Sequence, residues 1–141
     1  MNRKYKLIKT DTKKYAGITL FRIKAKISFG DVSKGDKGGY IEKEENLSTS
    51  DNAWVYDNAW VSGNAWVYGN AWVSGNAWVY NNARVSGNTE VYGNARVSGH
   101  ARVSGDAWVA GNARVSGNAR VSGDAWVAGN ARVSGNATNR R

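Results

Sequence analysis

Residues 104–121 read SGDAWVAGNARVSGNARV, and residues 122–139 read SGDAWVAGNARVSGNATN. The two segments differ only at their last two positions, so the second segment repeats the first. Each segment holds three copies of a hexapeptide, Asn/Asp-Ala-Trp/Arg-Val-Ser/Tyr/Ala-Gly. The hexapeptide runs without a gap over residues 52–135, which makes fourteen successive units. Such a period decides the architecture before any local signal does.

Each hexapeptide predicts a short strand followed by a bend. Its Ala and Val are two positions apart and therefore point to the same side of an extended strand, while the Trp or Arg between them points to the other. The Gly-Asn or Gly-Asp that follows is a turn signal, because Gly takes a positive φ at little cost. One such strand cannot bury its apolar pair alone, but parallel coils stacked ~4.8 Å apart can.

Three strands and three corners in each 18-residue coil predict an all-β fold, a parallel β-helix of triangular section. Fourteen hexapeptides give about 4.7 regular coils (84/18). We expect residues 1–50 to form an N-terminal β cap and a first irregular coil, and residues 51–141 to form the hexapeptide-repeat β-helix. The alternative, a disordered low-complexity tract, does not explain a Val at every sixth position or seven Trp.

The first fifty residues carry no hexapeptide, and they predict a cap for the exposed edge of the stack. Residues 4–8 indicate a strand, residues 11–14 a polar turn, and residues 18–28 a half-buried strand. Ile41 and Leu47 are six positions apart, so we expect them to begin the first coil. The apolar residues of the alternating strand are Phe21, Ile23, Ala25 and Ile27.

The motif Val-Ser-Gly-Asn-Ala-Arg is similar to the hexapeptide repeat of left-handed parallel β-helices, a family best known from acyltransferases. The resemblance covers residues 52–135, more than half of the chain, and implies a left-handed, single-stranded helix. Residues 29–32, 38–42 and 46–48 also resemble the N-terminal module of bacterial and phage-type hexapeptide-repeat proteins. That second resemblance suggests an inhibitor of a host complex and brings no catalytic motif.

The hexapeptide acyltransferases, by this resemblance, would use a His as general base beside a loop that builds the acyl-donor site. His100 is the single His of the chain and replaces the Asn or Asp of one corner. No loop interrupts the 14 units, so we expect no walled pocket for a general base.

Asp106 and Asp124 share one corner of the predicted helix, where they could bind a cation, but Ca²⁺ requires six to eight oxygen ligands. We therefore predict no enzymatic activity, no metal and no cofactor, and an Asn ladder along the rod.

The outward third position of each unit falls on one of three faces. One face carries Trp54, Trp72, Glu90, Trp108 and Trp126. The next carries Trp60, Trp78, Arg96, Arg114 and Arg132, and the third carries Trp66, Arg84, Arg102 and Arg120. We expect Trp ladders that either stabilise the stack or form a contact patch, and Arg ladders that either keep the rod soluble or attract an anionic partner.

The function predicted from these ladders is binding or scaffolding. The partner is a protein with an acidic surface, bound by all seven Trp and by the six Arg just named, with sequence-independent nucleic-acid binding along the Arg ladders as an alternative. Residues 82–141 hold eight Arg against three acidic residues, which supports an anionic partner. A homodimer through the C-terminal end is a further expectation, motivated by an open edge. The lack of Cys, of an apolar signal segment and of a membrane span predicts a cytoplasmic protein.

Overall fold

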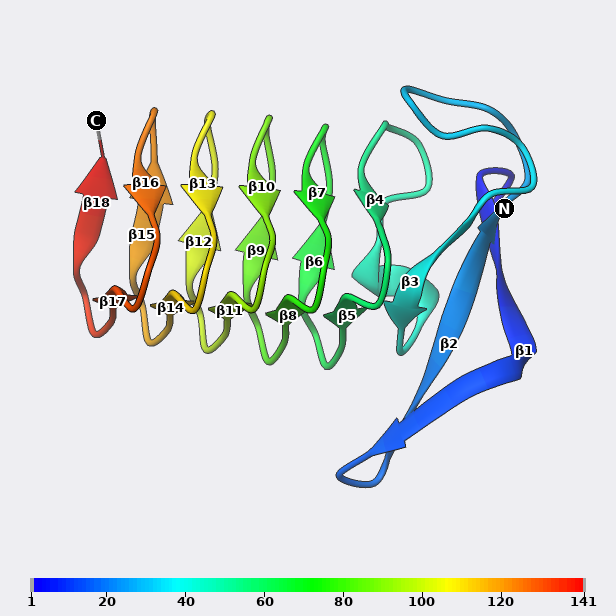
Figure 1. The fold of residues 1–141 in the computed structure, drawn as a ribbon, viewed down its shortest axis with the longest axis horizontal. Coiled ribbons are helices and arrows are strands. Elements are labelled where there is room, and N and C mark those ends of the chain that lie inside the picture. The colour runs from blue at the N-terminus through cyan, green and yellow to red at the C-terminus, as the bar shows by residue number, and fades with distance from the viewer. Residues whose placement is uncertain (1, 141) are drawn as a thin grey trace.

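Each hexapeptide forms one short strand and one turn in the computed structural model, which describes residues 2–140. The strands stack into a rod, and a β hairpin stands at the N-terminal end of the rod (Figure 1). The strands of the rod are β4 (Trp54–Val55), β5 (Trp60–Val61), β6 (Trp66–Val67), β7 (Trp72–Val73), β8 (Trp78–Val79), β9 (Arg84–Val85), β10 (Glu90–Val91), β11 (Arg96–Val97), β12 (Arg102–Val103), β13 (Trp108–Val109), β14 (Arg114–Val115), β15 (Arg120–Ser122), β16 (Trp126–Val127), β17 (Arg132–Val133) and β18 (Thr138–Arg140).

Three parallel sheets run along the rod, one on each face. The Trp face has the order β16-β13-β10-β7-β4, and the Arg face has the order β18-β15-β12-β9-β6. The cap face contains β5-β8-β11-β14-β17 and continues into the N-terminal strands. Each strand of the rod pairs with the third strand along the chain, as Trp108 pairs with Trp126 and Val109 with Val127. The predicted all-β parallel β-helix with three hexapeptides in each coil is therefore confirmed.

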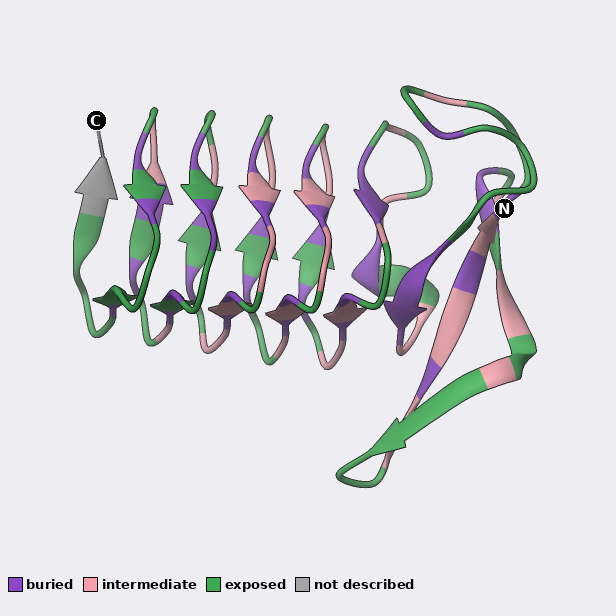
Figure 2. Ribbon diagram, in the orientation of Figure 1, coloured by how far each residue is buried: buried purple, intermediate pink, exposed green. Residues whose placement is uncertain are grey.

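The Ala and Val of the hexapeptides fill the interior of the rod. In Figure 2, buried positions recur from coil to coil along the rod and alternate with half-buried and exposed positions. Val73, Val91 and Val109, for example, are all fully buried. Thr89 stands where the other units have Ala and is also fully buried. Its hydroxyl donates a hydrogen bond to the carbonyl oxygen of Ser86, so the core holds this polar atom at little cost.

The last position of every hexapeptide lies in the left-handed region of backbone space. Twelve of these 14 positions are Gly, and the two exceptions are Asp57 (φ 57°) and Asn81 (φ 60°). Asn and Asp are the residues that tolerate this region best after Gly. A Cβ on Gly87 (φ 72°) would also lie 2.7 Å from the carbonyl oxygen of Gly105 in the next coil. The corners therefore require Gly both for the turn and for close stacking of the coils.

The cap begins as an antiparallel hairpin and becomes part of the first coil. Strands β1 (Tyr5–Tyr15) and β2 (Ile18–Ala25) are antiparallel, and β2 pairs antiparallel with β3 (Lys37–Ile41). Strand β3 then pairs parallel with β5, and a short 3-10 helix (Glu44–Asn46) follows it. In that pairing Ile41 lies opposite Val61, and Leu47 forms a bridge with Val67. The predicted start of the first coil at Ile41 and Leu47 is confirmed.

Two adjacent glycines allow β3 to cross the end of the core. A Cβ on Gly38 would lie 2.4 Å from the carbonyl oxygen of Val55, and a Cβ on Gly39 would lie 2.6 Å from that of Ala59. Real Cβ atoms are not found so close to backbone oxygens. The sequence Gly38-Gly39 therefore decides how closely the cap can seal the core.

Two details of the predicted cap are wrong. Residues 11–14 form no turn, because β1 continues to Tyr15 and the chain reverses at Ala16 and Gly17, both with positive φ. Ile27 is 46% exposed, and Phe21 is only half-buried, whereas Leu20, Ile23 and Ala25 are buried. Register shifts interrupt both hairpin pairings, so the alternation of inward and outward side chains changes phase along β2.

Three carboxylates close the corners of the first coil. Each accepts a hydrogen bond from the backbone N–H of the corner Gly one coil further on, at 2.7 to 3.1 Å. The pairs are Glu42 with Gly63, Asp51 with Gly69, and Asp57 with Gly75.

Within residues 2–140 no helix is long and apolar enough to cross a membrane.

Candidate partner-binding surface

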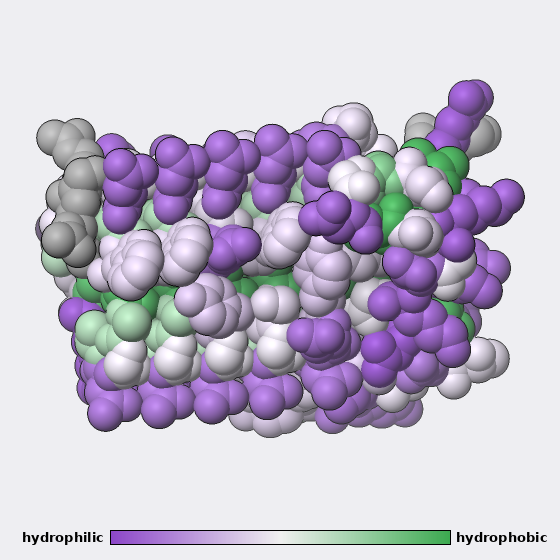
Figure 3. Space-filling view, turned by 45° about the horizontal axis from the view of Figure 1, so that its top comes forward, coloured by the Kyte–Doolittle hydropathy of each residue, from purple (hydrophilic) through white to green (hydrophobic). Residues whose placement is uncertain are grey.

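The outward residues of the hexapeptides form ladders on the three faces, as predicted. On the cap face Arg96 pairs in register with Arg114, and Arg114 with Arg132. On the Arg face the ladder runs through Arg84, Arg102 and Arg120. Figure 3 shows how hydrophilic side chains line the edges of the rod, with larger and paler side chains in the row between them. Long side chains on neighbouring rungs, ~4.8 Å apart, must therefore lie side by side.

Trp54 is not part of any exposed surface, so its prediction as a partner-binding residue is wrong. Only 1% of Trp54 is exposed. Tyr5 and Phe29 from the cap pack against its ring at centroid distances of 6.2 and 5.3 Å, both edge-on. The first coil of the Trp face is thus covered by the cap, and Trp54 anchors the cap to the rod.

Trp60 and Trp78 form a half-buried pair on the cap face. Their rings stack with centroids 4.6 Å apart and planes only 6° from parallel. Tyr15, at the tip of the β1–β2 hairpin, lies against Trp60 at 5.5 Å and against Trp78 at 5.2 Å. The hairpin therefore folds back beside the rod, and aromatic contacts join the two.

A polar network holds the hairpin in this position. Arg22 of β2 forms a salt bridge with Asp11 of β1 at 2.9 Å. The same guanidinium donates to the carbonyl oxygen of Gly38 at 2.7 Å and to the hydroxyl of Tyr40 at 2.7 Å. It also stacks on the Tyr40 ring, 4.4 Å from the centroid. Sequence reasoning missed this network, because its members are brought together only by the sheet.

The remaining Trp side chains contribute exposed or half-buried aromatic area. Trp66 on the Arg face is 39% exposed, and Trp108 and Trp126 on the Trp face are 36% and 60% exposed. Trp108 and Trp126 stack with centroids 4.9 Å apart at 7°. Trp72 is half-buried beside Tyr56, 5.3 Å away. The aromatic surface is therefore divided into separate patches on the different faces.

Five of the six ladder Arg are exposed, and Arg96 is half-buried. Among the side chains that the structure describes, the salt bridges are Lys4–Asp51 and Arg22–Asp11, and neither involves a ladder Arg. Two ladder Arg contact aromatic rings, Arg96 at 4.5 Å from the Trp78 centroid and Arg84 at 6.0 Å from that of Trp66. The ladders thus present positive charge that no carboxylate of the described chain neutralises.

Lys4 is a buried cation that no pattern in the sequence indicates. Only 2% of it is exposed, and its ammonium donates to the carbonyl oxygens of Ser48 and Ala53 at 3.0 and 2.6 Å. Burial lowers the pKa of Lys4 to about 8, although Asp51 at 3.8 Å acts in the opposite direction. These bonds fix the chain between the cap and the first hexapeptide, so we assign Lys4 a structural role.

His100 lies on an exposed corner of the rod. It borders an open groove of about 480 Å³ together with Arg102, Asn118 and Arg120. The groove follows the edge of the Arg face, and polar and cationic side chains dominate it. Such a lining suits an anion, but within residues 2–140 no projecting loop brings an acidic or basic catalytic group toward the imidazole.

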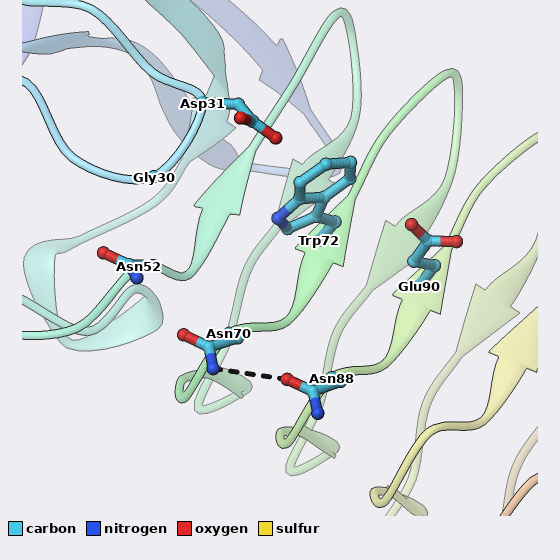
Figure 4. Close-up of a pocket in the computed structure, with 7 residues that line it drawn as sticks. All are labelled: Gly30, Asp31, Asn52, Asn70, Trp72, Asn88 and Glu90. Carbon is cyan, nitrogen blue, oxygen red and sulfur yellow. Dashed lines mark hydrogen bonds between the residues drawn. The ribbon is translucent and has the colours of Figure 1, made fainter.

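A smaller cavity of about 290 Å³ opens on the Trp face near the cap (Figure 4). Trp72 lies between the carboxylates of Asp31 and Glu90, and Asn70 donates to Asn88 at 3.2 Å. The Asn70–Asn88 bond belongs to the predicted Asn ladder, which is confirmed at several corners. No three His, Cys, Asp or Glu residues of the described chain converge as metal ligands would.

The comparisons with known proteins agree with this architecture. No curated protein matches the chain. Five segments of the repeat region match a family described as YdcK Beta solenoid repeat, and they are residues 53–69, 59–75, 65–81, 95–111 and 113–129. The matched segments lie wholly within the coils described above, so what this chain shares with that family is its β-solenoid repeat.

Proposed function

We propose that this chain is a non-catalytic binding protein, whose rigid β-helix recognises an acidic surface on a partner protein. One observation carries the proposal: two of the three faces bear Arg ladders with no carboxylate partner among the described side chains. Neighbouring cations repel each other by about 1 kcal/mol even in water. An acidic partner would relieve this repulsion and contribute charge-assisted hydrogen bonds.

The exposed Trp side chains support a protein as the partner. Interface centres are enriched in Trp and Arg, which are the two residue types that fill the outward positions here. A stacked rod also needs little rearrangement to bind. Less of the binding free energy is therefore spent on ordering the side chains and loops of the interface. The resemblance of residues 29–32, 38–42 and 46–48 to phage-type proteins extends the proposal to inhibition of a host complex.

Sequence-independent nucleic-acid binding is a second candidate, favoured by the groove at His100, Arg102 and Arg120. Phosphates would lie along the Arg face, and affinity would fall steeply with salt, because the release of counterions from the nucleic acid becomes less favourable. Affinity for a protein partner depends on apolar contacts as well, so it would fall less steeply. The two candidates therefore differ in a measurable way.

A capture experiment separates the two candidates. Immobilised wild type is compared with a variant in which Arg102, Arg114, Arg120 and Arg132 are changed to Gln, at low and at moderate salt. Capture of nucleic acid that is lost in the variant and in moderate salt would assign the ladders to phosphate. Stoichiometric capture of one defined protein that weakens in the variant supports recognition of an acidic surface. If neither is captured, the proposed function is wrong.

A further inference from the structure

A cleft of about 430 Å³ lies between the hairpin tip and the cap face. Tyr15 forms one side, the Trp60–Trp78 pair lies beneath it, and Tyr80 and Glu42 border it from the corners of the coils. Arg96 closes the end that points toward the later coils. This volume lies within the range of pockets that bind small ligands, and its aromatic lining suits an apolar side chain.

The cleft continues directly into an Arg ladder. Arg96 stacks on Trp78 and pairs in register with Arg114, which pairs with Arg132. A guanidinium that rests on an aromatic ring keeps its N–H edge available for a carboxylate. One face of the rod thus presents an aromatic cleft followed by three cations in a straight row. The Arg face also bears a ladder, but no hairpin of the described residues covers it.

The geometry points to an extended acidic peptide segment of a partner protein as the occupant, an inference that rests on the function proposed above. One aromatic or large apolar side chain of the peptide enters the cleft that Tyr15, Trp78 and Tyr80 border. The carboxylates that follow it bind Arg96, Arg114 and Arg132. Three coil steps separate Trp78 from Arg132, or about 14 Å, which an extended peptide spans in about four residues. The expected motif is therefore one large apolar residue with two or three acidic residues within about four positions.

The arrangement of the rings favours a peptide over a nucleobase. Single-stranded nucleic acids bind by stacking their bases on the faces of aromatic side chains. Here Trp60 and Trp78 stack on each other, and Arg96 covers the other face of Trp78. A nucleic acid would gain more on the Arg face.

The test uses fluorescein-labelled peptides, Ser-Phe-Asp-Ser-Asp-Asp-Ser and its reversed sequence, because the direction of the bound chain is open. Fluorescence anisotropy gives the Kd for wild type, Tyr15→Ala and Arg96→Gln. Arg102→Gln is the matched control, since it removes the same charge from the Arg face. We expect Tyr15→Ala and Arg96→Gln to weaken binding about tenfold or more, and Arg102→Gln to leave it within about twofold. Replacing Phe by Ala in the peptide should cost a similar factor.

Two results would overturn the inference. One is that neither peptide binds the wild type, and the other is that Arg102→Gln weakens binding as much as Arg96→Gln does. Equal thermal unfolding midpoints show that all variants are folded, which is expected because Tyr15 is 50% exposed. If a captured protein is lost from the four-Arg variant yet still binds Tyr15→Ala and Arg96→Gln, the cleft is wrong and the proposed function stands. Failure of the capture experiment itself tells against the proposed function.

Discussion

Tyr15, at the tip of the hairpin, packs edge-on against Trp78 of the rod, with ring centroids 5.2 Å apart and planes at 63°. This contact ties an extended hairpin to the side of a stack of coils, and Tyr15 makes a second contact with Trp60. The hairpin therefore does more than close the end of the core. It also forms one side of the cleft on the cap face.

Loss of the Arg22 side chain should release the hairpin tip. Arg22→Met removes the salt bridge to Asp11 and the hydrogen bonds to Gly38 and Tyr40. Hydrogen bonds to charged groups contribute about 1.5–3 kcal/mol each. We expect backbone amides near the tip to exchange with solvent about tenfold faster or more, measured by hydrogen exchange. Lys14→Met, on the exposed side of β1, should leave them unchanged, and equal protection in both variants would contradict the role of Arg22.

Trp54 and Trp126 occupy the same place in the repeat but should differ strongly in their effect on stability. Trp54→Ala removes a fully buried ring from between the cap and the rod, and we expect a loss of about 3–5 kcal/mol in the free energy of unfolding. Trp126 is 60% exposed, so Trp126→Ala should cost about 1 kcal/mol or less. Denaturant unfolding of both variants measures the difference. Similar losses would show that the cap does not cover Trp54 in solution.

Because of Lys4, the protein should be more stable near pH 10 than at pH 8. The pKa of Lys4 falls from 10.5 to about 8 on folding, so the unfolded chain binds the proton more tightly than the native state between these values. The free energy of unfolding should then rise from pH 8 toward pH 10, by up to about 3 kcal/mol. Urea unfolding at several pH values tests this. Lys4→Met should be less stable at every pH and should lack most of the rise.

Two tyrosines should reverse this trend above pH 10. Burial raises the pKa of Tyr5 far above its ordinary value and that of Tyr56 to about 12. Nearby carboxylates add to both shifts. A tyrosine of the unfolded chain ionises near pH 10, whereas these two remain neutral in the native state. Their contribution is complete below pH 10 and is lost at higher pH, so stability should pass through a maximum near pH 10. Continued stabilisation up to pH 11 would contradict it.

Replacing a corner glycine should destabilise the protein in two ways, through backbone strain and through a clash with the next coil. Gly87→Ala adds a methyl group 2.7 Å from the oxygen of Gly105 and forces Ala to adopt a φ of 72°. Gly35→Ala imposes a similar strain at φ 95°, but the methyl group meets no atom within 4 Å. We expect Gly35→Ala to cost about 1 kcal/mol and Gly87→Ala clearly more, measured by denaturant unfolding. Asn81→Gly, at a corner that already tolerates Asn, should be nearly neutral.

The repeat region of the fold follows from the sequence alone. The repeat of every third hexapeptide gives the number of strands in a coil, and the hexapeptide itself indicates which residues face inward and which form ladders. Each contact of this kind joins residues that are 18 positions apart in the sequence, as Trp108 and Trp126 are. The repeat pattern is therefore enough to predict which residues pair. The Asn ladder and the assignment of every outward residue to its face were predictable for the same reason.

The cap and its contacts with the rod were decided only by the tertiary structure. Trp54 and Trp126 have the same place in the repeat, yet the cap buries one and leaves the other exposed. Lys4 is buried because residues 48–53 and the ring of Phe29 pack around it, and Tyr15 meets Trp78 because the hairpin lies against the side of the rod. A non-repeating segment has no period that fixes its partners. Its position depends on side-chain packing between distant parts of the chain, which no local pattern encodes.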